Sequence, residues 1–480
     1  MNQQVEQRYL VNKTFDEIHV GDSASLTRTL IPEDVKLFAI LTGDVNPAVV
    51  DPKFSESGMF REVIAHGMWS GSLISTVLGT QFPGPGTILV DQSLHFARPV
   101  TIGDRITITV TAKQKFEHNK HVVFDCVCTN QEGLQVVRGK AEVLAPLEKV
   151  SRLQEVHMPE IRIDDKHERY THLLERVKGL EPIPTAVAHP CDAESLKGPV
   201  MAFQAGIIEP ILVGPENKIR AVAEEFGIDL HGIRIVNAAH SHDAAALAVS
   251  LVRTGDAEAL MKGSLHTDEL MGEVVARANG LRTSRRISHV FLMDVPTYHR
   301  PLLITDAAIN IAPTLEEKAD IIRNAIDLAH VIGIPEPKVA ILSAVETINP
   351  KIQSTLDAAA LCKMADRGQI KGGLLDGPLA FDNAISAQAA EIKHIESRVA
   401  GDADILAVPD LESGNMLAKQ LEYLAGASGS GIVLGARVPI ALTSRADGPT
   451  ARVASALLAV LVAYDARRVR APKAAAPIKD

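Results

Sequence analysis

The stretch Val438-Pro-Ile-Ala-Leu-Thr-Ser-Arg-Ala-Asp-Gly-Pro449 predicts the strand and helix that organise the C-terminal part of the chain. Its apolar start indicates a buried strand, and the nearly all-apolar run Val453 to Ala463 beyond it indicates a buried helix. In open α/β sheets, ligands bind at the carboxyl ends of strands. Ser444 and Arg445 would enter such a crevice beside free N–H groups and the positive end of the helix dipole. Arginine can also grip a phosphate with two hydrogen bonds, so the stretch predicts an anion site.

The same side chains also suit a simpler role. Thr443, Ser444 and Asp447 are residue types that cap helices, and Arg445 would then be a solvated charge. On this stretch alone, a phosphate site and a plain helix cap stand as equal alternatives.

Length and composition limit the class of protein. At 480 residues the chain is long for one core, so we expect two or three domains. A content of 46% hydrophobic and 22% charged residues is typical of a globular protein, and 4% aromatic residues favour helix-covered parallel sheets over an all-β chain. The net charge of -10 argues against nucleic acid as a partner, so a phosphate-bearing ligand needs a local basic pocket.

Membrane and redox signals are weak. The run Val453 to Ala463 is shorter than the roughly 20 residues of a bilayer span, and the polar start Met1-Asn-Gln-Gln-Val-Glu is unlike a signal peptide. We therefore expect a cytoplasmic protein without membrane association. The cysteines are too few and too scattered for a disulfide framework, and we expect no metal or redox role for Cys126, Cys128, Cys191 and Cys362.

The first 145 residues are rich in strand patterns. Pro32 to Leu41 and Met68 to Leu78 are predicted to be helices. Alternating residues predict strands at Arg105 to Thr111, in much of His121 to Thr129, and at Val136 to Leu144. Few helices beside a run of antiparallel strands indicate an α+β domain in which a sheet wraps one buried helix.

Three segments here resemble the MaoC-like hydratase family: Leu41-Thr-Gly-Asp-Val-Asn-Pro-Ala-Val-Val-Asp51, Ile64-Ala-His-Gly-Met68 and His95-Phe-Ala-Arg-Pro-Val100. The resemblance covers most of residues 15 to 145 and implies a hot-dog fold that adds water to (2E)-enoyl-CoA. It also implies that Asp44 moves a proton, that Asn46 orients the site, and that the Gly67 N–H polarises the thioester oxygen.

One position departs from that family. The family has a histidine two residues after the proline as the acid/base partner of the aspartate, and this chain has Val49. Valine cannot move a proton, and losing such a partner lowers a rate by about 10² to 10⁴-fold. We therefore expect the domain at residues 1–145 to bind acyl-CoA and to hydrate it poorly or not at all. His66 is either a substitute acid/base group or a structural turn residue.

The sequence pattern changes after this domain. Residues 146–170 are charged and weakly periodic, as in a linker, and residues 469–480 are predicted to be a disordered tail. From about residue 171, strand-like runs alternate with amphipathic helices such as Leu315 to Ile332, which predicts a largely parallel, doubly wound sheet. The strand-like runs include Ile233 to Ala238, Val290 to Val295, Lys338 to Ser343 and Ile405 to Pro409.

Polar clusters follow several predicted strands of this half. Each alone is a weak signal, because Gly, Asp and Asn usually make turns there. Together with Leu442-Thr-Ser-Arg445 they resemble the phosphate acetyltransferase and phosphate butyryltransferase family, nearer its butyryl branch, over about residues 175 to 468. The clusters are Lys262-Gly-Ser-Leu-His-Thr267, Arg282-Thr-Ser-Arg-Arg286, Thr305-Asp-Ala-Ala-Ile-Asn310, Asp376-Gly-Pro-Leu-Ala-Phe-Asp382 and Pro409-Asp-Leu-Glu-Ser-Gly-Asn415.

This second resemblance implies an α/β domain at residues 171–468, with two subdomains around a cleft as in isocitrate dehydrogenase, that forms at least a dimer. It implies exchange of acyl groups between CoA and inorganic phosphate, with no metal or bound cofactor and with the coenzyme A thioester as a substrate. Arg445 would hold the phosphate, and Ser444 would contact the sulfur or the developing oxyanion. Binding residues carried over from the two resemblances are Asn46, Lys262, Ser264, His266, Thr267, Arg286, Thr305, Asp306, Asp376, Asp382, Gly414 and Asn415.

Three carboxylates are candidates for the base that deprotonates the CoA thiol. The acetyl branch has an aspartate seven residues after this serine, where the present chain has Ala451. Asp447 is the nearest candidate, with Asp376 and Asp306 as alternatives. The cluster Arg282, Arg285 and Arg286 either meets CoA phosphates or is a solvated strand flank.

Three hypotheses follow for the whole chain. The preferred one is a phosphate acyltransferase fused to an acyl-CoA-binding hot-dog domain with an impaired hydratase site. A fully bifunctional (R)-specific hydratase and acyltransferase is the second. The third is a non-catalytic protein in which both halves sense acyl-CoA.

Overall fold

The computed structural model describes residues 9–44, 46–47, 64–153, 168–444 and 447–470. The chain divides into two compact units, Met1–Asp164 and Asp165–Asp480, which are described separately.

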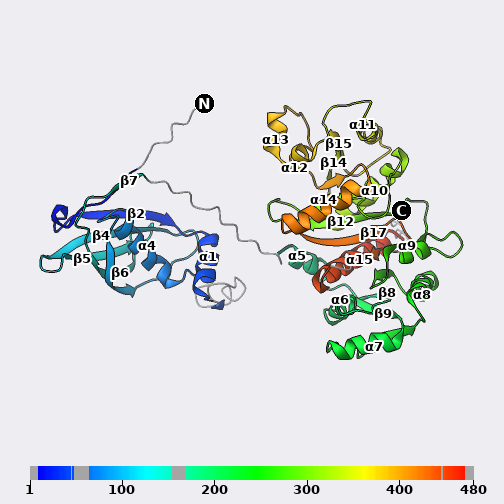
Figure 1. Ribbon diagram of the computed structural model, residues 1–480, viewed down its shortest axis with the longest axis horizontal. Coiled ribbons are helices and arrows are strands. Elements are labelled where there is room, and N and C mark those ends of the chain that lie inside the picture. The colour runs from blue at the N-terminus through cyan, green and yellow to red at the C-terminus, as the bar shows by residue number, and fades with distance from the viewer. Residues whose placement is uncertain (1–8, 45, 48–63, 154–167, 445–446, 471–480) are drawn as a thin grey trace, which may run out of the picture. The chain divides into compact units, whose positions relative to one another are not determined.

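The first unit is a curved antiparallel sheet that packs on one long helix (Figure 1). Residues Ile106, Ile108 and Val110 alternate with more exposed ones and are fully buried, so one face of the sheet forms the core under helix α4 (Gly67–Thr80). This agrees with the predicted α+β arrangement. The strands are β2 (Ser23–Thr29), β3 (Ile88–Phe96), β4 (Arg105–Phe116), β5 (His121–Thr129) and β6 (Gln135–Leu144), in the order β2-β4-β5-β6-β3.

Short elements surround that sheet. Helix α1 (Pro32–Thr42) begins with proline and ends at Gly43, whose φ of 70° is the left-handed conformation of a helix C-cap. Strand β1 (Tyr9–Val11) pairs with β7 (Ser151–Leu153). Helix α5 begins at Glu168, so the stretch 146–170 that we predicted as a linker contains a strand and the start of a helix.

The second unit is built on an eleven-stranded mixed sheet among the described residues. The strands are β8 (Ile183–Ala188), β9 (Ile208–Gly214), β10 (Arg234–Asn237), β11 (Ala259–Lys262), β12 (Ser288–Asp294), β13 (Leu302–Thr305), β14 (Lys338–Leu342), β15 (Leu374–Leu379), β16 (Ile405–Ala407), β17 (Ser428–Leu434) and β18 (Ile440–Ala441). Their order is β10-β9-β8-β11-β18-β17-β12-β13-β16-β14-β15.

Two parallel blocks of this sheet run in opposite directions. The first block is β10-β9-β8-β11-β18 and the second is β13-β16-β14-β15, and β17 and β12 join them by antiparallel pairings. We predicted a largely parallel sheet. The observed sheet differs from this prediction because its central strands, β17 and β12, pair antiparallel with their neighbours. Each block has its own carboxyl edge, and the two edges face opposite ways.

Helices cover both faces of the sheet. In Figure 1, α14 and α15 lie on opposite sides of β17, and their buried side chains belong to different core clusters. The helices are α5 (Glu168–Val177), α6 (Ala193–Gln204), α7 (Glu216–Glu225), α8 (Ser241–Thr254), α9 (Thr267–Val275), α10 (Leu315–Val331), α11 (Gln353–Asp366), α12 (Phe381–Ile385), α13 (Ala387–Ile392), α14 (Leu411–Leu424) and α15 (Pro449–Arg470).

Helix α15 is longer than predicted, with 22 residues. Its segment Pro449–Arg468 is long and apolar enough to cross a membrane by length and composition alone. In the fold, Leu457, Leu458 and Val460 are buried in the core that α15 shares with α5, α10 and the sheet. Its apolar character is therefore explained by burial within this unit.

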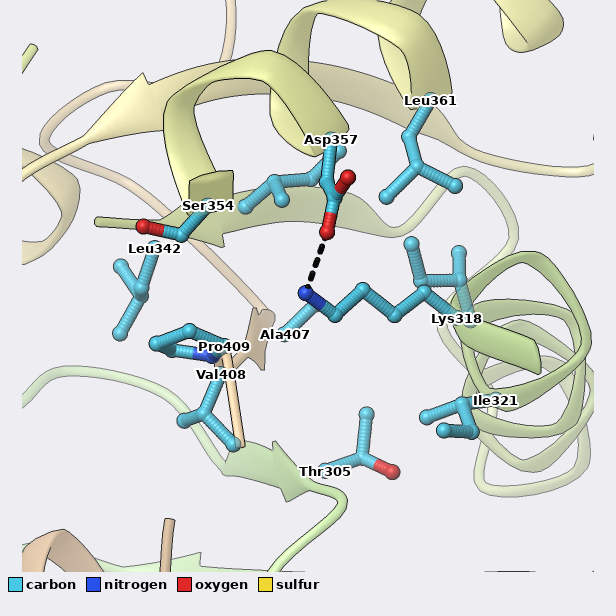
Figure 2. Close-up of a pocket in the computed structure, with 12 residues that line it drawn as sticks. Thr305, Lys318, Ile321, Leu342, Ser354, Asp357, Leu361, Ala407, Val408 and Pro409 are labelled. Atoms are coloured by element: carbon cyan, nitrogen blue, oxygen red, sulfur yellow. Dashed lines mark hydrogen bonds and ion pairs between the residues drawn. The ribbon is translucent and has the colours of Figure 1, made fainter. Parts of the chain in front are cut away.

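A buried ion pair joins α10 to α11 (Figure 2). Lys318 Nζ lies 2.7 Å from Asp357 Oδ2, and the two residues are only 9% and 7% exposed. Gln353 Nε2 donates to the other carboxylate oxygen at 2.8 Å. A cavity of about 10 Å³ beside the pair is bordered by Thr305 and Ser354 together with apolar side chains. The pair is thus enclosed by protein on nearly every side.

Candidate active site

Three neighbouring parallel strands bring the first set of predicted residues together. β11 lies between β8 and β18, with Lys262 opposite Ala188 and Met261 opposite Ala441. The segments that follow these strands therefore leave the same edge of the sheet. One carries Lys262 to Thr267, and the other carries Ser444 and Asp447.

The backbone N–H and the backbone carbonyl of Ser444 both make hydrogen bonds. Its N–H donates to Asp447 Oδ2 at 2.7 Å, and its carbonyl accepts from Arg452 Nη2 at 3.1 Å. Thr443 Oγ1 accepts from Arg452 Nη1 at 3.0 Å. Asp447 thus fixes the segment after β18 directly, and Thr443 fixes it through the side chain of Arg452 on α15. Arg445 lies outside the described residues.

Asp447 has the electrostatics of a proton acceptor. Burial raises its pKa above the usual aspartate range, while the hydrogen bond from the Ser444 N–H and the charges of Lys419 and Arg452 oppose the shift. The charge of Glu422 on α14 adds to the increase. A carboxylate with a raised pKa holds a proton more tightly, so it is a stronger base than an exposed aspartate.

The loop after β11 is tightly fixed. Ser264 Oγ donates to the His189 carbonyl at 2.8 Å, and the Ser264 N–H donates to the same oxygen at 2.9 Å. Lys262 is 3% exposed, whereas His266 is exposed at the N-cap of α9. Thr267 is the first residue of that helix, so its backbone N–H belongs to the first turn.

A second group of predicted residues lies at the other carboxyl edge. Because β13 and β16 run opposite to β18, the turn that starts with Thr305 and Asp306 leaves the sheet on the side where β18 begins. Asp306 accepts hydrogen bonds from the backbone N–H groups of residues 308, 309 and 310 and from Asn310 Nδ2. Thr305 Oγ1 donates to the His289 carbonyl at 2.8 Å. These side chains hold the turn in place.

Helix α14 packs closely on that turn. A Cβ added at Gly414 would lie 2.8 Å from the Asp306 carbonyl oxygen and 2.7 Å from Val408 Cγ2. Asn415 Nδ2 donates to the Ala307 carbonyl at 3.2 Å. The sequence signal at Gly414 and Asn415 is therefore explained by close packing between α14 and the 306–310 turn.

The arginine cluster lines a cavity of about 490 Å³ at the same edge, together with Asn310, Glu317 and Asp320. Arg286 Nε donates to Asn310 Oδ1 at 2.6 Å, and Arg286 Nη1 pairs with Glu317 at 2.8 Å. Arg285 pairs with Asp327 at 2.8 Å. Carboxylates thus neutralise two of the three arginines, and Arg282 is exposed.

The remaining predicted carboxylates lie far along the sheet. Asp376 is on the edge strand β15, six strand positions from β18, which corresponds to roughly 29 Å along the sheet. Asp382 is in the first turn of α12 and pairs with Lys393 at 3.0 Å. The fold does not bring either carboxylate to Ser444.

The first unit has a second candidate site. Asp44 Oδ1 accepts from the Asn46 N–H at 3.0 Å, and Asp44 Oδ2 lies 3.4 Å from His66 Nε2. His66 Nδ1 accepts from the Met68 N–H at 3.1 Å, so a neutral His66 carries its proton on Nε2, facing Asp44. Gly67 is the first residue of α4. Val49 lies outside the described residues.

Sequence reasoning missed two charged residues that lie beside Ser444 and Asp447. Arg452 lies in the first turn of α15, where the helix dipole disfavours a cation, and that mismatch was a readable signal. Lys419 is on α14 and near enough to affect the pKa of Asp447. Nothing local in the sequence marks Lys419, because only the tertiary fold brings α14 beside Asp447.

Two of the cysteines are core residues, and the other two are partly buried. Cys126 and Cys128 are fully buried in the first unit, and burial raises the pKa of each thiol to about 12. Within the described ranges, no group of three or more His, Cys, Asp or Glu side chains is arranged to hold a metal.

Known proteins match the two units separately. Residues 238–460 match the family described as phosphate acetyl/butaryl transferase, and residues 17–130 match the MaoC like domain. The phosphate acetyltransferase of Rhizobium meliloti is 62% identical over 307 residues, which are 64% of this chain and 96% of that protein. The phosphate butyryltransferase of Clostridium acetobutylicum is 44% identical over 294 residues, covering 61% of this chain and 98% of that protein.

A solved structure agrees with these matches. The branched-chain phosphotransacylase from Enterococcus faecalis V583 has 30% sequence identity and a TM-score of 0.50. The match covers 59% of this chain and 99% of that protein. The predicted fold class is thereby confirmed for both parts: a hot-dog domain followed by a phosphotransacylase-like α/β domain.

Proposed function

The chain belongs to the phosphate acetyl/butyryltransferase family and also carries a MaoC-like domain, and from this premise we propose that it exchanges a short acyl group between CoA and inorganic phosphate. The observation that carries the proposal is near full-length similarity to two acyltransferases, across 96% and 98% of their lengths. The half-buried Asp447 beside Ser444 supplies a proton acceptor that such a reaction needs.

The proposed reaction is a displacement at the thioester carbon. A phosphate oxygen attacks that carbon, the C–S bond breaks, and the products are the acyl phosphate and CoA, whose sulfur gains a proton. In reverse, Asp447 takes the proton from the CoA thiol, and the thiolate attacks the carbonyl carbon of the acyl phosphate. The C–O bond to the phosphate breaks, and inorganic phosphate leaves. Ser444 contacts the sulfur or the oxyanion, and Arg445 holds the phosphate.

The edge shared by β11 and β18 is the proposed substrate site. Lys262, Ser264, His266 and Thr267 leave the sheet beside Ser444, so we place the binding of CoA and phosphate there. The turn at Thr305 and Asp306, which Arg286, Gly414 and Asn415 support from neighbouring segments, leaves the opposite edge of the sheet. We therefore propose that it stabilises the fold and does not contact substrate at the edge of β11 and β18. Asp376 and Asp382 have no part in this site because of their distance along the sheet.

The MaoC-like domain is proposed to bind acyl-CoA and to hydrate it slowly. Hydration needs one group to take a proton and another to deliver one. Both His66 nitrogens are already engaged, Nδ1 with the Met68 N–H and Nε2 with Asp44, so His66 is suited to orient Asp44. A second proton-transfer group would then be lacking, because Val49 stands where the family has histidine.

Arg445 offers a direct test of the proposed phosphate site. Arg445→Ala is expected to raise the KM for phosphate, or lower kcat, by at least about tenfold, because a charge that grips phosphate is lost. Arg445→Lys should retain most of that loss, since lysine cannot form the forked contact. Steady-state kinetics at varied phosphate measure both variants. Unchanged phosphate kinetics in Arg445→Ala would leave this loop without its assigned role.

Val49 offers the matching test in the first domain. Val49→His is expected to raise the hydration rate of a short (2E)-enoyl-CoA by about 10² to 10⁴-fold over a slow parent, because it restores the missing acid/base group. Loss of enoyl thioester absorbance measures both proteins side by side, with folding checked by circular dichroism. Rapid hydration by the parent would contradict the impaired site and establish a bifunctional enzyme.

A further inference from the structure

Arg452 is a fully buried arginine at the start of α15. It is 1% exposed and the largest of the fully buried side chains in the described parts of the chain. Arginine is almost never buried without partners, and a cation in the first turn of a helix is opposed by the helix dipole. Burial lowers the pKa of Arg452, while Asp192, Asp447 and Glu194 favour its charged form. Such an unfavourable place for a charge calls for a local reason.

The contacts of Arg452 supply that reason. Nη1 donates to the Lys262 carbonyl at 3.3 Å and to Thr443 Oγ1 at 3.0 Å. Nη2 donates to the Ser444 carbonyl at 3.1 Å. One planar group therefore bonds to the ends of both neighbouring strands, β11 and β18. Lysine could not span these acceptors, because its donors share a single nitrogen.

Helix α6 is shaped to let this side chain pass. A Cβ added at Gly198 would lie 2.7 Å from Arg452 Cβ and 2.8 Å from Arg452 Cδ. Gly198 is inside α6, where glycine lowers helix stability by about 1 kcal/mol relative to alanine. The glycine is therefore explained by the Arg452 stem that lies against it.

We infer that Arg452 is a positioning residue for acyl transfer. Its guanidinium bonds to the Ser444 and Lys262 carbonyls and so fixes the distance between the segments that follow β11 and β18. The inference rests on the proposed role of Ser444. Asp447 fixes the Ser444 N–H from one side and Arg452 fixes its carbonyl from the other, so the serine backbone cannot shift unless one of these contacts breaks.

The test compares four variants of the full chain. Arg452→Lys and Arg452→Met remove the two guanidinium nitrogens that bond to the strand ends. Gly198→Ala keeps the guanidinium but displaces the aliphatic part of the Arg452 side chain. Leu457→Ala is the control, because Leu457 is fully buried in the same helix and its side chain belongs to an apolar core cluster. For each variant, Tm, kcat and the KM for phosphate are measured, and kcat is expressed per folded molecule.

We expect kcat to fall by about 10 to 100-fold in both Arg452 variants and less in Gly198→Ala, because small misplacements at a reacting centre have effects of this size. The KM for phosphate should change by less than about threefold. Leu457→Ala should lower Tm and leave kcat within about twofold. If Arg452→Met does not fold, Arg452→Lys and Gly198→Ala carry the test.

A lower Tm with unchanged kcat in the Arg452 variants would overturn the inference and leave Arg452 with a purely structural role. Failure of the proposed function looks different, because the wild-type protein would then release no thiol from acyl-CoA in the presence of phosphate.

Discussion

Replacing Asp447 by asparagine is expected to lower kcat for thioester formation from acyl phosphate and CoA by about 10² to 10⁴-fold. The amide keeps an oxygen that can accept the Ser444 N–H, a bond of 2.7 Å in the native protein, but it cannot take a proton. The variant therefore separates proton transfer from the positioning of Ser444. Asp465→Asn is a matched control, because Asp465 lies on α15, the helix that follows Asp447, and pairs with Arg468 at 3.1 Å.

The pH dependence of kcat/KM distinguishes a base from a residue that only supports the structure around Ser444. Burial raises the pKa of Asp447, and Lys419 and Arg452 only partly offset this effect. As the pH falls, the carboxylate is protonated at a higher pH than an ordinary aspartate, so the acid limb of kcat/KM should lie above the usual aspartate range. Asp447→Asn should remove this limb. A variant with native kcat and the same limb would exclude Asp447 as the base.

The second large effect concerns stability. Removing one partner of the buried Lys318–Asp357 pair is expected to lower the free energy of unfolding by about 3 to 5 kcal/mol, because the other charge is left buried and unpaired. Lys318→Met leaves the Asp357 carboxylate buried without its partner. Asp357→Leu leaves the Lys318 ammonium buried without its partner. Urea denaturation followed by circular dichroism measures each loss.

The double variant Lys318→Met/Asp357→Leu provides the control. Without either charge, the space shown in Figure 2 is filled by apolar side chains of similar size, and stability should return to within about 1 to 2 kcal/mol of the native value. A double variant whose loss equals the sum of the two single losses would mean that the residues act independently.

Local patterns in the sequence predicted much of the fold. Alternation at Arg105 to Thr111 predicted β4, because every second side chain enters the core. The amphipathic run Leu315 to Ile332 predicted α10, which ends one residue earlier, at Val331. The two resemblances predicted both families because their motifs are short and contiguous in the chain.

Long-range features were not predictable in the same way. The antiparallel placement of β17 depends on pairing between strands far apart in sequence, and it sends Asp306 and Ser444 to opposite edges of the sheet. Helix α15 starts at Pro449, four residues before the apolar run, and the charged Arg452 in its first turn is buried against the ends of β11 and β18. Hydrophobic periodicity identifies a helix by its apolar residues, so it does not detect a first turn whose buried residue is charged.

We propose that this chain transfers an acyl group from CoA to phosphate. The direct measurement is thiol release from acetyl-CoA, butyryl-CoA and longer acyl-CoA substrates, with and without inorganic phosphate, using the full-length protein. We predict release that requires phosphate, saturates with it, and forms one equivalent of acyl phosphate per thiol. Thiol release that is independent of phosphate, or no release with any chain length, would contradict the claim.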